Sequence, residues 1–385
     1  MSERPSLRLK RGRERVWVHP WIFKGDVADV SLSEAGVVDV VDSRARFVGR
    51  GFYNPRPGLC CRILTWADEA IDLEFFRRRM AEAAARRGGT DLGRLVWSEA
   101  DGLPGLVVDR YGPVAVMQCM TLGMASVRSE LVRAVRRVVG DVAVFVADDA
   151  AAAAMEGFAP ALGWQDSAGP ESVVVQEALA RLLVRFGSGH KTGLYLDQSE
   201  NRTRVGALAA GRTVLDVFSY TAGFACHALV GGATRAVCVE SSADALAGAL
   251  DNLALNGVAD RAEVRATNAF DELRRLDREG ARFGLVVLDP PPFARGRSQI
   301  EAAMRGYKEI NLRAMRLLEP GGLLATFSCS HHVSESDFDA VCRNAATDAG
   351  VRLRTLAPLA QSADHPVLLT VPETRYLKGL LLQAL

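Results

Sequence analysis

Ala325-Thr326-Phe327-Ser328-Cys329-Ser330 decides the fold of this 385-residue chain. An apolar run from Leu323 to Phe327 follows Pro320-Gly321-Gly322, a pattern typical of a turn that leads into a buried parallel strand. The run ends in a thiol that two hydroxyls flank. Because ligands of open α/β sheets bind outside the carboxyl ends of the strands, Cys329 stands where a nucleophile would stand. The alternative is a buried, inert cysteine, which is common in apolar surroundings.

A second apolar run, earlier in the chain, predicts a neighbouring strand. Leu285 to Leu288 would deliver Asp289 and Pro290-Pro291-Pro292 to the same edge. Beyond residue 187, strand and helix patterns alternate, which predicts an α/β fold with a parallel, doubly wound sheet. We expect strands at Thr213–Phe218, Ala236–Glu240, Ala262–Ala266, Phe283–Asp289 and Leu323–Ser328, and helices at Phe224–Val230, Ala243–Asn256, Phe270–Glu279 and Ile300–Leu318.

The loop after the first of these strands, within Leu215 to Gly223, lacks the GxGxxG pattern of dinucleotide sites. Its single glycine suits a nucleoside-type cofactor without a pyrophosphate. Asp216 lies in this strand and Glu240 ends the next one, where an acid can accept both ribose hydroxyls. Asn268 follows the third strand, where a polar side chain could meet an adenine edge. Either acid alone could be a solvated loop carboxylate, but both at consecutive strand ends favour S-adenosylmethionine over NAD.

The composition is that of a soluble globular protein with two or three domains: 49% hydrophobic and 24% charged residues, with a net charge of +1. That balance excludes a polycation, so any nucleic-acid contact must come from local basic patches. No window has the length of a membrane span and the N-terminus lacks an apolar leader, so we expect a cytoplasmic protein with no membrane partner. Seven cysteines without a CxxC pair and six histidines without ligand spacing predict reduced thiols and no metal site.

Residues 1–24 combine seven basic and two acidic side chains, a local charge of +5, with Trp17, His19, Trp21 and Phe23. Basic side chains bind phosphates and aromatic rings stack on bases, so this segment is a candidate nucleic-acid surface. A solvated charged face over an aromatic core corner is an equally good interpretation.

The chain divides into three predicted domains. Short strand patterns predict a small, β-barrel-like domain at residues 1–72. Residues 73–186 have the pattern of a middle α+β domain, for which substrate holding is the natural role. Gly187 to Gly193 is a hinge, and residues 187–385 form the domain with the doubly wound sheet.

A set of short motifs runs in order along nearly the whole chain. They are Lys10-Arg11-Gly12-Arg13-Glu14 with His19-Pro20-Trp21, Ser98-Glu99-Ala100-Asp101-Gly102-Leu103-Pro104-Gly105, Asp109-Arg110-Tyr111-Gly112, Gly189-His190-Lys191-Thr192-Gly193, Tyr195-Leu196-Asp197-Gln198, Phe218-Ser219-Tyr220-Thr221, Asp289-Pro290-Pro291, Gly306-Tyr307-Lys308-Glu309-Ile310-Asn311, Thr326-Phe327-Ser328-Cys329-Ser330, Ala363-Asp364-His365-Pro366 and Tyr376-Leu377-Lys378-Gly379. Together they resemble the cytosine-5 methyltransferases of bacterial 23S ribosomal RNA that carry an N-terminal PUA domain.

The resemblance implies a PUA domain at the N-terminus and a Rossmann-like class I methyltransferase sheet at the C-terminus. It also implies methyl transfer from S-adenosylmethionine to C5 of a cytosine in 23S ribosomal RNA. Cys329 would be the thiolate that adds to C6, and Asp289 would hydrogen-bond or protonate the pyrimidine N3. Thr192 is expected to line the cofactor and base pocket. The expected cofactor-binding residues are Lys191, Tyr195, Asp197, Gln198, Asp216, Phe218, Ser219, Tyr220, Gly223, Glu240, Asn268, Asp289 and Pro290.

The implied partner is 23S ribosomal RNA, naked or in an assembling large subunit. The PUA domain and arginine-rich surfaces would hold its backbone, and the target base would leave its stack to reach the pocket. The habit of the family suggests a homodimer. Three places depart from the family pattern: Pro292, His331-His332, and the segment Ala147 to Ala154, which lacks basic residues.

Two other functions stay open. Asp-Pro-Pro-Pro-Phe at residues 289–293 also fits methyltransferases that modify a base nitrogen of guanine or adenine, which need no thiol. The other is a non-catalytic RNA-binding assembly factor with the same fold, although Asp216, Glu240, Asp289 and Cys329 speak against it.

Overall fold

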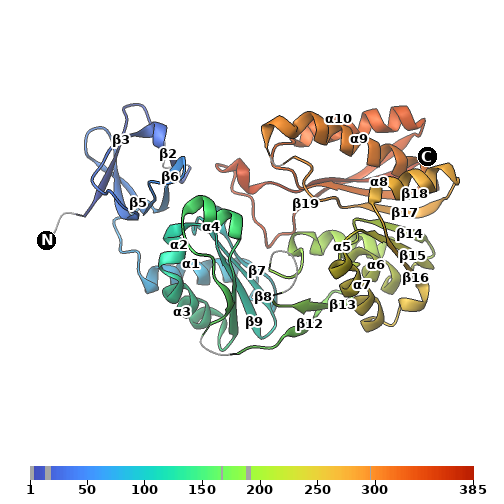
Figure 1. Cartoon of the computed structure of the whole chain (residues 1–385), viewed down its shortest axis with the longest axis horizontal. Coiled ribbons are helices and arrows are strands. Elements are labelled where there is room, and N and C mark those ends of the chain that lie inside the picture. The colour runs from blue at the N-terminus through green and yellow to red at the C-terminus, as the bar shows by residue number, and fades with distance from the viewer. Residues whose placement is uncertain (1–3, 14–18, 166–167, 188–191, 295) are drawn as a thin grey trace. The chain divides into compact units, whose positions relative to one another are not determined.

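The chain folds into two units (Figure 1). Unit 1 consists of Met1–Val173, Arg185–Leu194 and Ala363–Thr374, and unit 2 of Val174–Val184, Tyr195–Ser362 and Arg375–Leu385. The structure is a computed structural model that describes residues 4–13, 19–165, 168–187, 192–294 and 296–385. Among these residues, no helix has the length and apolar character needed to cross a membrane.

The N-terminal part of unit 1 is a six-stranded sheet in the order β2-β6-β5-β4-β1-β3. Leu9, Ile22 and Ile63 belong to its core. At Gly51 in β5, a Cβ atom would lie 2.1 Å from the carbonyl oxygen of Arg62, so only glycine lets β5 and β6 approach so closely. The strands are β1 (Ser6–Leu9), β2 (Trp21–Phe23), β3 (Val27–Val30), β4 (Gly36–Val41), β5 (Phe47–Tyr53) and β6 (Leu59–Thr65).

The second part of unit 1 is a five-stranded sheet, β11-β10-β9-β8-β7, with helices packed on it. Helix α1 begins where the Asp72 carboxylate accepts a hydrogen bond from the Phe75 amide at 2.9 Å. Phe76 and Met80 of α1 share one core with Leu131 of α3. The elements are α1 (Leu73–Arg86), β7 (Leu92–Trp97), β8 (Leu106–Tyr111), β9 (Val114–Cys119), α2 (Leu122–Ser126), α3 (Arg128–Val139), β10 (Ala143–Ala147), α4 (Ala150–Glu156) and β11 (Leu162–Trp164).

Two aromatic side chains of the basic N-terminal segment make contacts within unit 1. The Trp21 indole donates a hydrogen bond to the Glu99 carboxylate at 2.8 Å, and the His19 ring meets the Trp21 ring edge-on at 5.2 Å. These contacts match the aromatic corner that was one of the two interpretations of this segment. Phe23 is exposed, and Trp17 lies outside the described residues.

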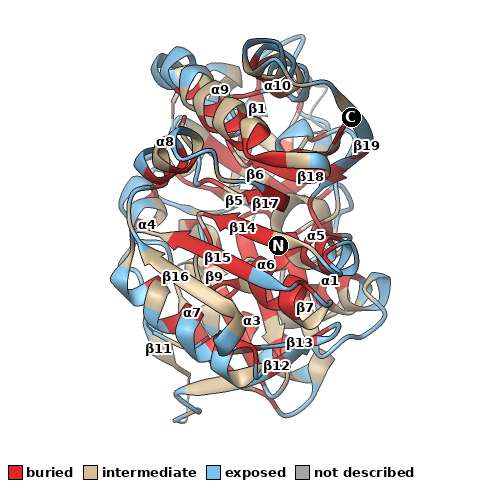
Figure 2. Cartoon of the chain, turned by 90° about the vertical axis from the view of Figure 1, so that its right-hand side faces the viewer, coloured by how far each residue is buried: buried red, intermediate tan, exposed pale blue. Residues whose placement is uncertain are grey.

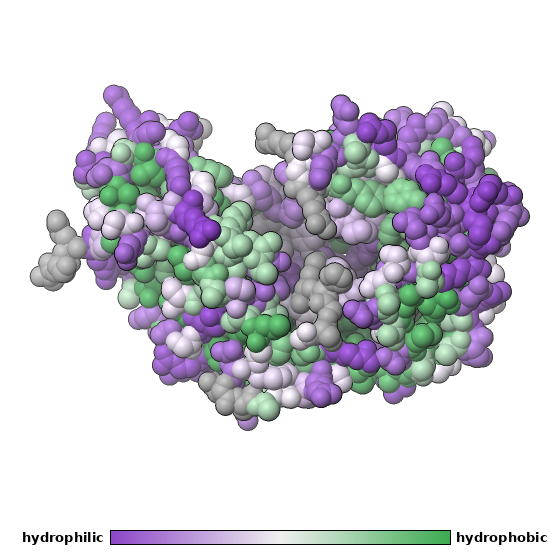
Figure 3. All heavy atoms as spheres, viewed as in Figure 1, coloured by the Kyte–Doolittle hydropathy of each residue, from purple (hydrophilic) through white to green (hydrophobic). Residues whose placement is uncertain are grey.

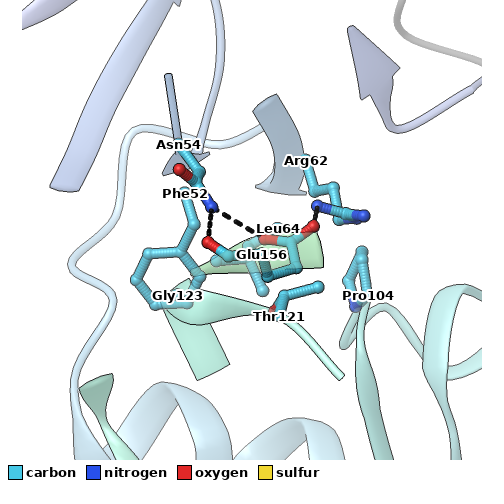
Figure 4. A pocket seen from close by; sticks show the side chains of 8 residues that line it. All are labelled: Phe52, Asn54, Arg62, Leu64, Pro104, Thr121, Gly123 and Glu156. Carbon is cyan, nitrogen blue, oxygen red and sulfur yellow. Dashed lines mark hydrogen bonds and ion pairs between the residues drawn. The ribbon is translucent and has the colours of Figure 1, made fainter. Parts of the chain in front are cut away.

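A small pocket between the two sheets of unit 1 surrounds the buried carboxylate of Glu156, the last residue of α4 (Figure 4). One carboxylate oxygen accepts a hydrogen bond from Asn54 Nδ2 at 2.9 Å, and the other pairs with Arg62 Nη1 at 2.9 Å. The cavity measures about 10 Å³, which is about the space of one water molecule. At Gly123 a Cβ atom would come 2.3 Å from the Phe52 ring, so a glycine is needed there. Glu156 therefore ties the N-terminal sheet to the second one.

Unit 2 is built on a seven-stranded sheet in the order β16-β15-β14-β17-β18-β20-β19. Strands β14 to β18 are parallel, and β20 runs antiparallel between β18 and β19. The strands are β14 (Thr213–Val217), β15 (Arg235–Glu240), β16 (Ala262–Ala266), β17 (Phe283–Leu288), β18 (Leu318–Ser328), β19 (Leu353–Ala360) and β20 (Lys378–Ala384). The strand order reverses beside β14, the kind of switch point where open sheets bind ligands.

Helices cover both faces of this sheet: α5, α6 and α7 one face, α8, α9 and α10 the other (Figure 1). The central strands β14 and β17 are almost entirely buried (Figure 2). Leu273 and Leu276 of α8 pack into the core, and Arg274 and Arg278 on its other face are exposed. Hydrophilic side chains gather at the right of Figure 3. The helices are α5 (Ser199–Ala207), α6 (Gly223–Val230), α7 (Ala243–Leu255), α8 (Ala269–Arg278), α9 (Ile300–Arg316) and α10 (Glu335–Ala349).

A hairpin of β12 (Ser172–Glu177) and β13 (Ala180–Arg185) contributes a buried ion pair to unit 2. Arg202 of α5 donates to both oxygens of Glu177, at 2.6 and 2.7 Å, and also to the carbonyl oxygen of Tyr195 at 2.9 Å. Burial raises the pKa of Glu177, but the Arg202 guanidinium more than offsets this and keeps the pKa below its usual value. The ion pair thereby fixes the chain where it returns to unit 2 at Tyr195.

The α/β fold with a parallel, doubly wound sheet is confirmed, and the five expected strands correspond to β14 to β18. Strand β18 begins earlier than expected, at Leu318, because Gly321 adopts a φ of 72° within a bulge instead of a turn ahead of the strand. The two antiparallel strands at this side of the sheet, β20 and the edge strand β19, were not predicted.

We expect Glu156→Ala to lower the free energy of unfolding by about 3 kcal/mol, because Arg62 and Asn54 lose the partner of a mostly buried ion pair and hydrogen bond. Urea denaturation followed by circular dichroism measures this. The control is Glu82→Ala on the exposed face of α1, which should change stability by less than about 0.5 kcal/mol. Equal denaturation midpoints for the two variants would contradict the structural role of Glu156.

Candidate active site at the carboxyl edge of the sheet

The loop between β14 and α6 is strained. Phe218, Tyr220 and Ala222 have φ values of 63°, 48° and 59°, a conformation that costs a non-glycine residue about 1–3 kcal/mol. The surrounding structure holds the loop: the Ser219 amide donates to the carbonyl oxygen of Val239 at 3.0 Å. Strain of this kind gathers at functional sites, which supports a ligand-binding role for this loop.

Asp216 and Glu240 lie beside this loop. Asp216 is buried; its Oδ2 accepts a hydrogen bond from the Ala225 amide at 3.1 Å, and its Oδ1 has no hydrogen-bond partner among the described residues. Burial raises the pKa of Asp216 to about 7, and the charges of Asp289 and Glu240 act in the same direction. The Glu240 carboxylate is held by the amides of Tyr220 at 3.0 Å and Ser242 at 2.9 Å. The edge thus presents fixed carboxyl groups suited to a cationic ligand.

Asp289 follows β17, and a chain of amide groups orients its carboxyl group. Gln198 Nε2 donates to Asp289 Oδ1 at 2.9 Å, and Asn201 Nδ2 donates to Gln198 Oε1 at 2.6 Å. Asn201 also donates to the carbonyl oxygen of Ala360 at 2.9 Å. Gln198 therefore contacts Asp289 directly, and Asn201, which no sequence pattern singled out, holds the Gln198 amide by a hydrogen bond.

Cys329 follows β18, next to the end of β17. Its Sγ lies 3.7 Å from the carbonyl oxygen of Pro290, and it is partly exposed, whereas the six other cysteines are buried. Ser330 Oγ lies 2.9 Å from the Tyr307 hydroxyl and accepts a hydrogen bond from the Ala294 amide at 3.3 Å. The structure thus brings Cys329 to the residue beside Asp289, and it holds the following residue rigidly.

A group of aromatic and acidic side chains lies near this pair. The Tyr376 hydroxyl donates to Asp197 Oδ2 at 2.6 Å, and the His331 ring stacks on Tyr376 at 5.6 Å. The Tyr195 ring meets Tyr220 edge-on at 5.1 Å. Burial is the main cause of the raised pKa of Tyr195, and the charges of Tyr220, Asp289, Asp197 and Cys329 add to it. Asp197 and Tyr195 are therefore near Asp289. Tyr376 also belongs to this group; it stands in one of the sequence motifs, but no role was predicted for it.

Other expected site residues lie elsewhere or have a structural partner. The Asn268 side chain caps α8 by accepting from the Phe270 amide at 2.9 Å, and it is exposed. Thr192 is buried in unit 1, where its hydroxyl donates to Asp109. Lys191 lies outside the described residues.

The remaining expected residues lie at the edge itself. Gly223 begins α6, where a Cβ atom would come 2.9 Å from Arg202 Cδ. The hydroxyl of Ser219 is buried without a hydrogen-bond partner among the described residues, and Phe218 packs edge-on against Phe293. Pro290 is buried and offers its carbonyl oxygen to Cys329.

Comparison with known families divides the chain into two matched parts. Residues 130–357 match the profile of S-adenosylmethionine-dependent methyltransferases, and residues 7–66 match that of PUA-like domains. Two curated relatives are named ribosomal RNA large subunit methyltransferase I. The protein from Klebsiella pneumoniae is 39% identical, with 97% of each chain covered, and that from Erwinia tasmaniensis is 38% identical, with 97% of this chain and 98% of the relative covered.

Two solved structures share the fold. One, from Streptococcus mutans and provisionally described as a S-adenosylmethionine-dependent methyltransferase, has a TM-score of 0.83 at 20% identity and covers 98% of this chain and 99% of that one. The other, provisionally described as a methyltransferase and crystallised with SAH, has a TM-score of 0.85 at 19% identity over the same shares. At this identity the likeness shows the fold alone. The three domain boundaries and the roles of individual site residues stay predictions.

We expect one fast-reacting thiol in the native protein. Cys329 is partly exposed, whereas burial raises the pKa of Cys119, Cys226 and Cys342 to about 12. Iodoacetamide at pH 8, with peptide mass spectrometry over time, should modify Cys329 at least about ten times faster than any other cysteine. A fast thiol that persists in Cys329→Ser, or several thiols of equal rate, would show that the site is not as described.

Proposed function

Because the chain belongs to the PUA-containing ribosomal RNA large subunit methyltransferase I family, whose cofactor is S-adenosylmethionine, we propose that it methylates C5 of a cytosine in 23S ribosomal RNA. The observation that carries the proposal is the partly exposed Cys329, whose Sγ lies 3.7 Å from the carbonyl oxygen of Pro290, the residue after Asp289. Methylation of a base nitrogen has no use for a thiol at that place.

The residues at the sheet edge fit the cofactor. S-adenosylmethionine carries a sulfonium and an ammonium group, and the buried Asp216 Oδ1 has no hydrogen-bond partner among the described residues. We expect Asp216, Glu240 and the loop from Phe218 to Tyr220 to hold the cofactor, with Glu240 accepting hydrogen bonds from the ribose hydroxyls. When bound, S-adenosylmethionine supplies an electrophilic methyl group.

Cys329 makes the target carbon reactive. C5 of cytosine is a poor nucleophile, so the thiolate sulfur first forms a bond to C6, and the electron pair of the C5–C6 double bond moves to C5. C5 would then take the methyl group, and the bond between that methyl group and the cofactor's sulfur would break, which leaves S-adenosylhomocysteine. A general base removes the C5 proton, the double bond re-forms and the sulfur–C6 bond breaks, which regenerates the thiolate.

Asp289 acts at N3 of the cytosine, which lies across the ring from C6. In its protonated form it donates a hydrogen bond to N3, where negative charge builds up as the sulfur adds. Gln198, which donates to Asp289 Oδ1 at 2.9 Å, fixes the orientation of this carboxyl group. The separation of roles follows from the two strand ends: β18 supplies the nucleophile and β17 supplies the acid.

The RNA must present the target base out of its stack, because a sheet edge cannot reach C6 within a helix. The PUA-like domain, together with exposed arginines such as Arg44 and Arg46, would hold the phosphate backbone. The relatives carry ribosomal RNA in their names, and this is the source of the proposed substrate.

Cys329→Ala should abolish methylation of 23S ribosomal RNA while S-adenosylmethionine binding persists. RNA that contains 5-fluorocytosine should form a covalent adduct with the wild-type protein, because fluorine at C5 cannot leave as a cation and the sulfur–C6 bond is retained. The adduct is read as a slower band on a denaturing gel. Cys342→Ala, at a buried cysteine of α10, is the matched control and should keep both activities.

Methylation that survives in Cys329→Ala, with 1-methylguanine or another nitrogen-methylated base as product, would replace C5 transfer by nitrogen transfer. Retained RNA binding with no binding of S-adenosylmethionine at millimolar concentration would leave a non-catalytic assembly factor.

Cofactor affinity should rise with pH through the titration of Asp216. Its pKa is raised to about 7, so the carboxyl group is largely protonated at pH 5.5 and largely ionised at pH 7.5, and only the ionised form attracts a cation. The association constant from isothermal titration calorimetry should therefore increase about tenfold over this range.

Asp216→Asn should bind S-adenosylmethionine about ten times more weakly at pH 7.5 and lose the pH dependence. Asp244→Asn, at an exposed position in the first turn of α7, is the control and should match the wild type. A pH profile that Asp216→Asn shares with the wild type would remove Asp216 from the cofactor site.

A further inference from the structure

Lys378, the first residue of β20, is a buried cation beside the turn that follows Cys329. The residue is only 9% exposed, and it pairs with Ser328 across the antiparallel ladder between β18 and β20. Its Nζ donates hydrogen bonds to the carbonyl oxygens of Ser330 and Val333, each at 2.7 Å. One ammonium group therefore closes the turn from Ser330 to Val333.

This ammonium group has no ion-pair partner among the described residues. Burial lowers the pKa of Lys378, and the charges of Cys329, Glu335 and Asp337 act in the opposite direction. Burying a charge without an ion pair is costly, and two backbone carbonyls could be satisfied by a neutral donor instead. The hydrogen bonds alone therefore do not explain why this position carries a positive charge. A thiolate at Cys329 is a neighbouring group that such a charge would stabilise.

We propose that Lys378 is a positioning residue for the methyl transfer reaction: it fixes the turn after Cys329 and stabilises the thiolate through its charge. The proposal rests on the proposed role of Cys329 as the nucleophile. A cation near a cysteine increases the fraction of thiolate at neutral pH, and a clamped turn keeps the sulfur aimed at one place.

Groups from several elements face Cys329. The phenol of Tyr195 and that of Tyr307 in α9 each interact electrostatically with Cys329. Asp289 immediately precedes Pro290, whose carbonyl oxygen contacts the Cys329 sulfur. A negative charge on any of these groups disfavours the thiolate. His331 and His332 lie in the turn itself, and Glu335 and Asp337 begin α10. Against these carboxylates and phenols, Lys378 supplies a positive charge from β20, so its removal should have a measurable effect on the thiol.

The test is the pH profile of Cys329 alkylation, measured with iodoacetamide and peptide mass spectrometry in the full-length protein without cofactor or RNA. In Lys378→Met the midpoint of the profile should move upward by about one pH unit, and the rate at pH 7 should fall about tenfold. Lys378→Arg should keep the wild-type profile. Lys308→Met, which removes a partly exposed lysine of α9 that pairs with Asp348, is the matched control and should leave the profile unchanged.

Lys378→Gln separates the charge from the hydrogen bonds, because an amide can still donate to a carbonyl of the turn. Its profile should shift as in Lys378→Met, and it takes the place of that variant if Lys378→Met does not fold by circular dichroism. An unchanged profile in a folded, uncharged variant would overturn the role of Lys378. The assay needs no methyl transfer, so a failure of the role of Lys378 is distinguishable from a failure of the proposed function, which the methylation of RNA by Cys329→Ala tests.

Discussion

The register of three parallel strands is the constraint on which the site depends. Strand β17 lies between β14 and β18, with Val217 opposite Leu288 and Leu288 opposite Thr326. The residues that follow these positions meet at one edge, which places Asp289 beside the segment that ends in Cys329. Because side chains alternate between the faces of a sheet, a slip of one residue would turn the core residues of a strand to the wrong face. The hydrophobic core therefore also sets the spacing of the reactive groups.

Two features at the same edge of the sheet destabilise the folded protein when no ligand is bound. Asp216 is buried, one of its oxygens has no hydrogen-bond partner among the residues that the structure describes, and the loop that follows it holds three non-glycine residues at positive φ. Each feature opposes folding by an amount that a neutral side chain or a glycine would avoid. A cationic cofactor bound at this edge would offset both costs, since a ligand that binds only the folded state stabilises that state. We therefore expect the folded protein to be more stable with its cofactor bound than without it.

Much of this arrangement could be predicted from the sequence. The apolar runs before Asp289 and Cys329 indicated buried parallel strands, and the alternation with helices indicated the doubly wound sheet. The acids at strand ends pointed to a nucleoside cofactor, and the family supports that. These predictions succeeded because they depend on local patterns, which buried strands and their ends express directly.

Features that depend on distant pairing could not be predicted. Strands β19 and β20 come from the end of the chain and close the sheet, and no local pattern shows that Lys378 will lie opposite Ser328. The contact of Gln198 with Asp289 joins residues that are 91 positions apart. Asn268 shows the opposite case, because a polar residue after a strand is equally suited to cap the next helix, and here it does so.

The central claim is that a sulfur at the end of β18 activates C5 of a cytosine. Tritium release tests it most directly: 23S ribosomal RNA labelled with [5-³H]cytosine is incubated with the protein and S-adenosylmethionine, and tritium in water is counted against methyl groups in the RNA. The account predicts one tritium released for each methyl group incorporated, because the C5 hydrogen must leave. Methyl incorporation with no tritium release would contradict it.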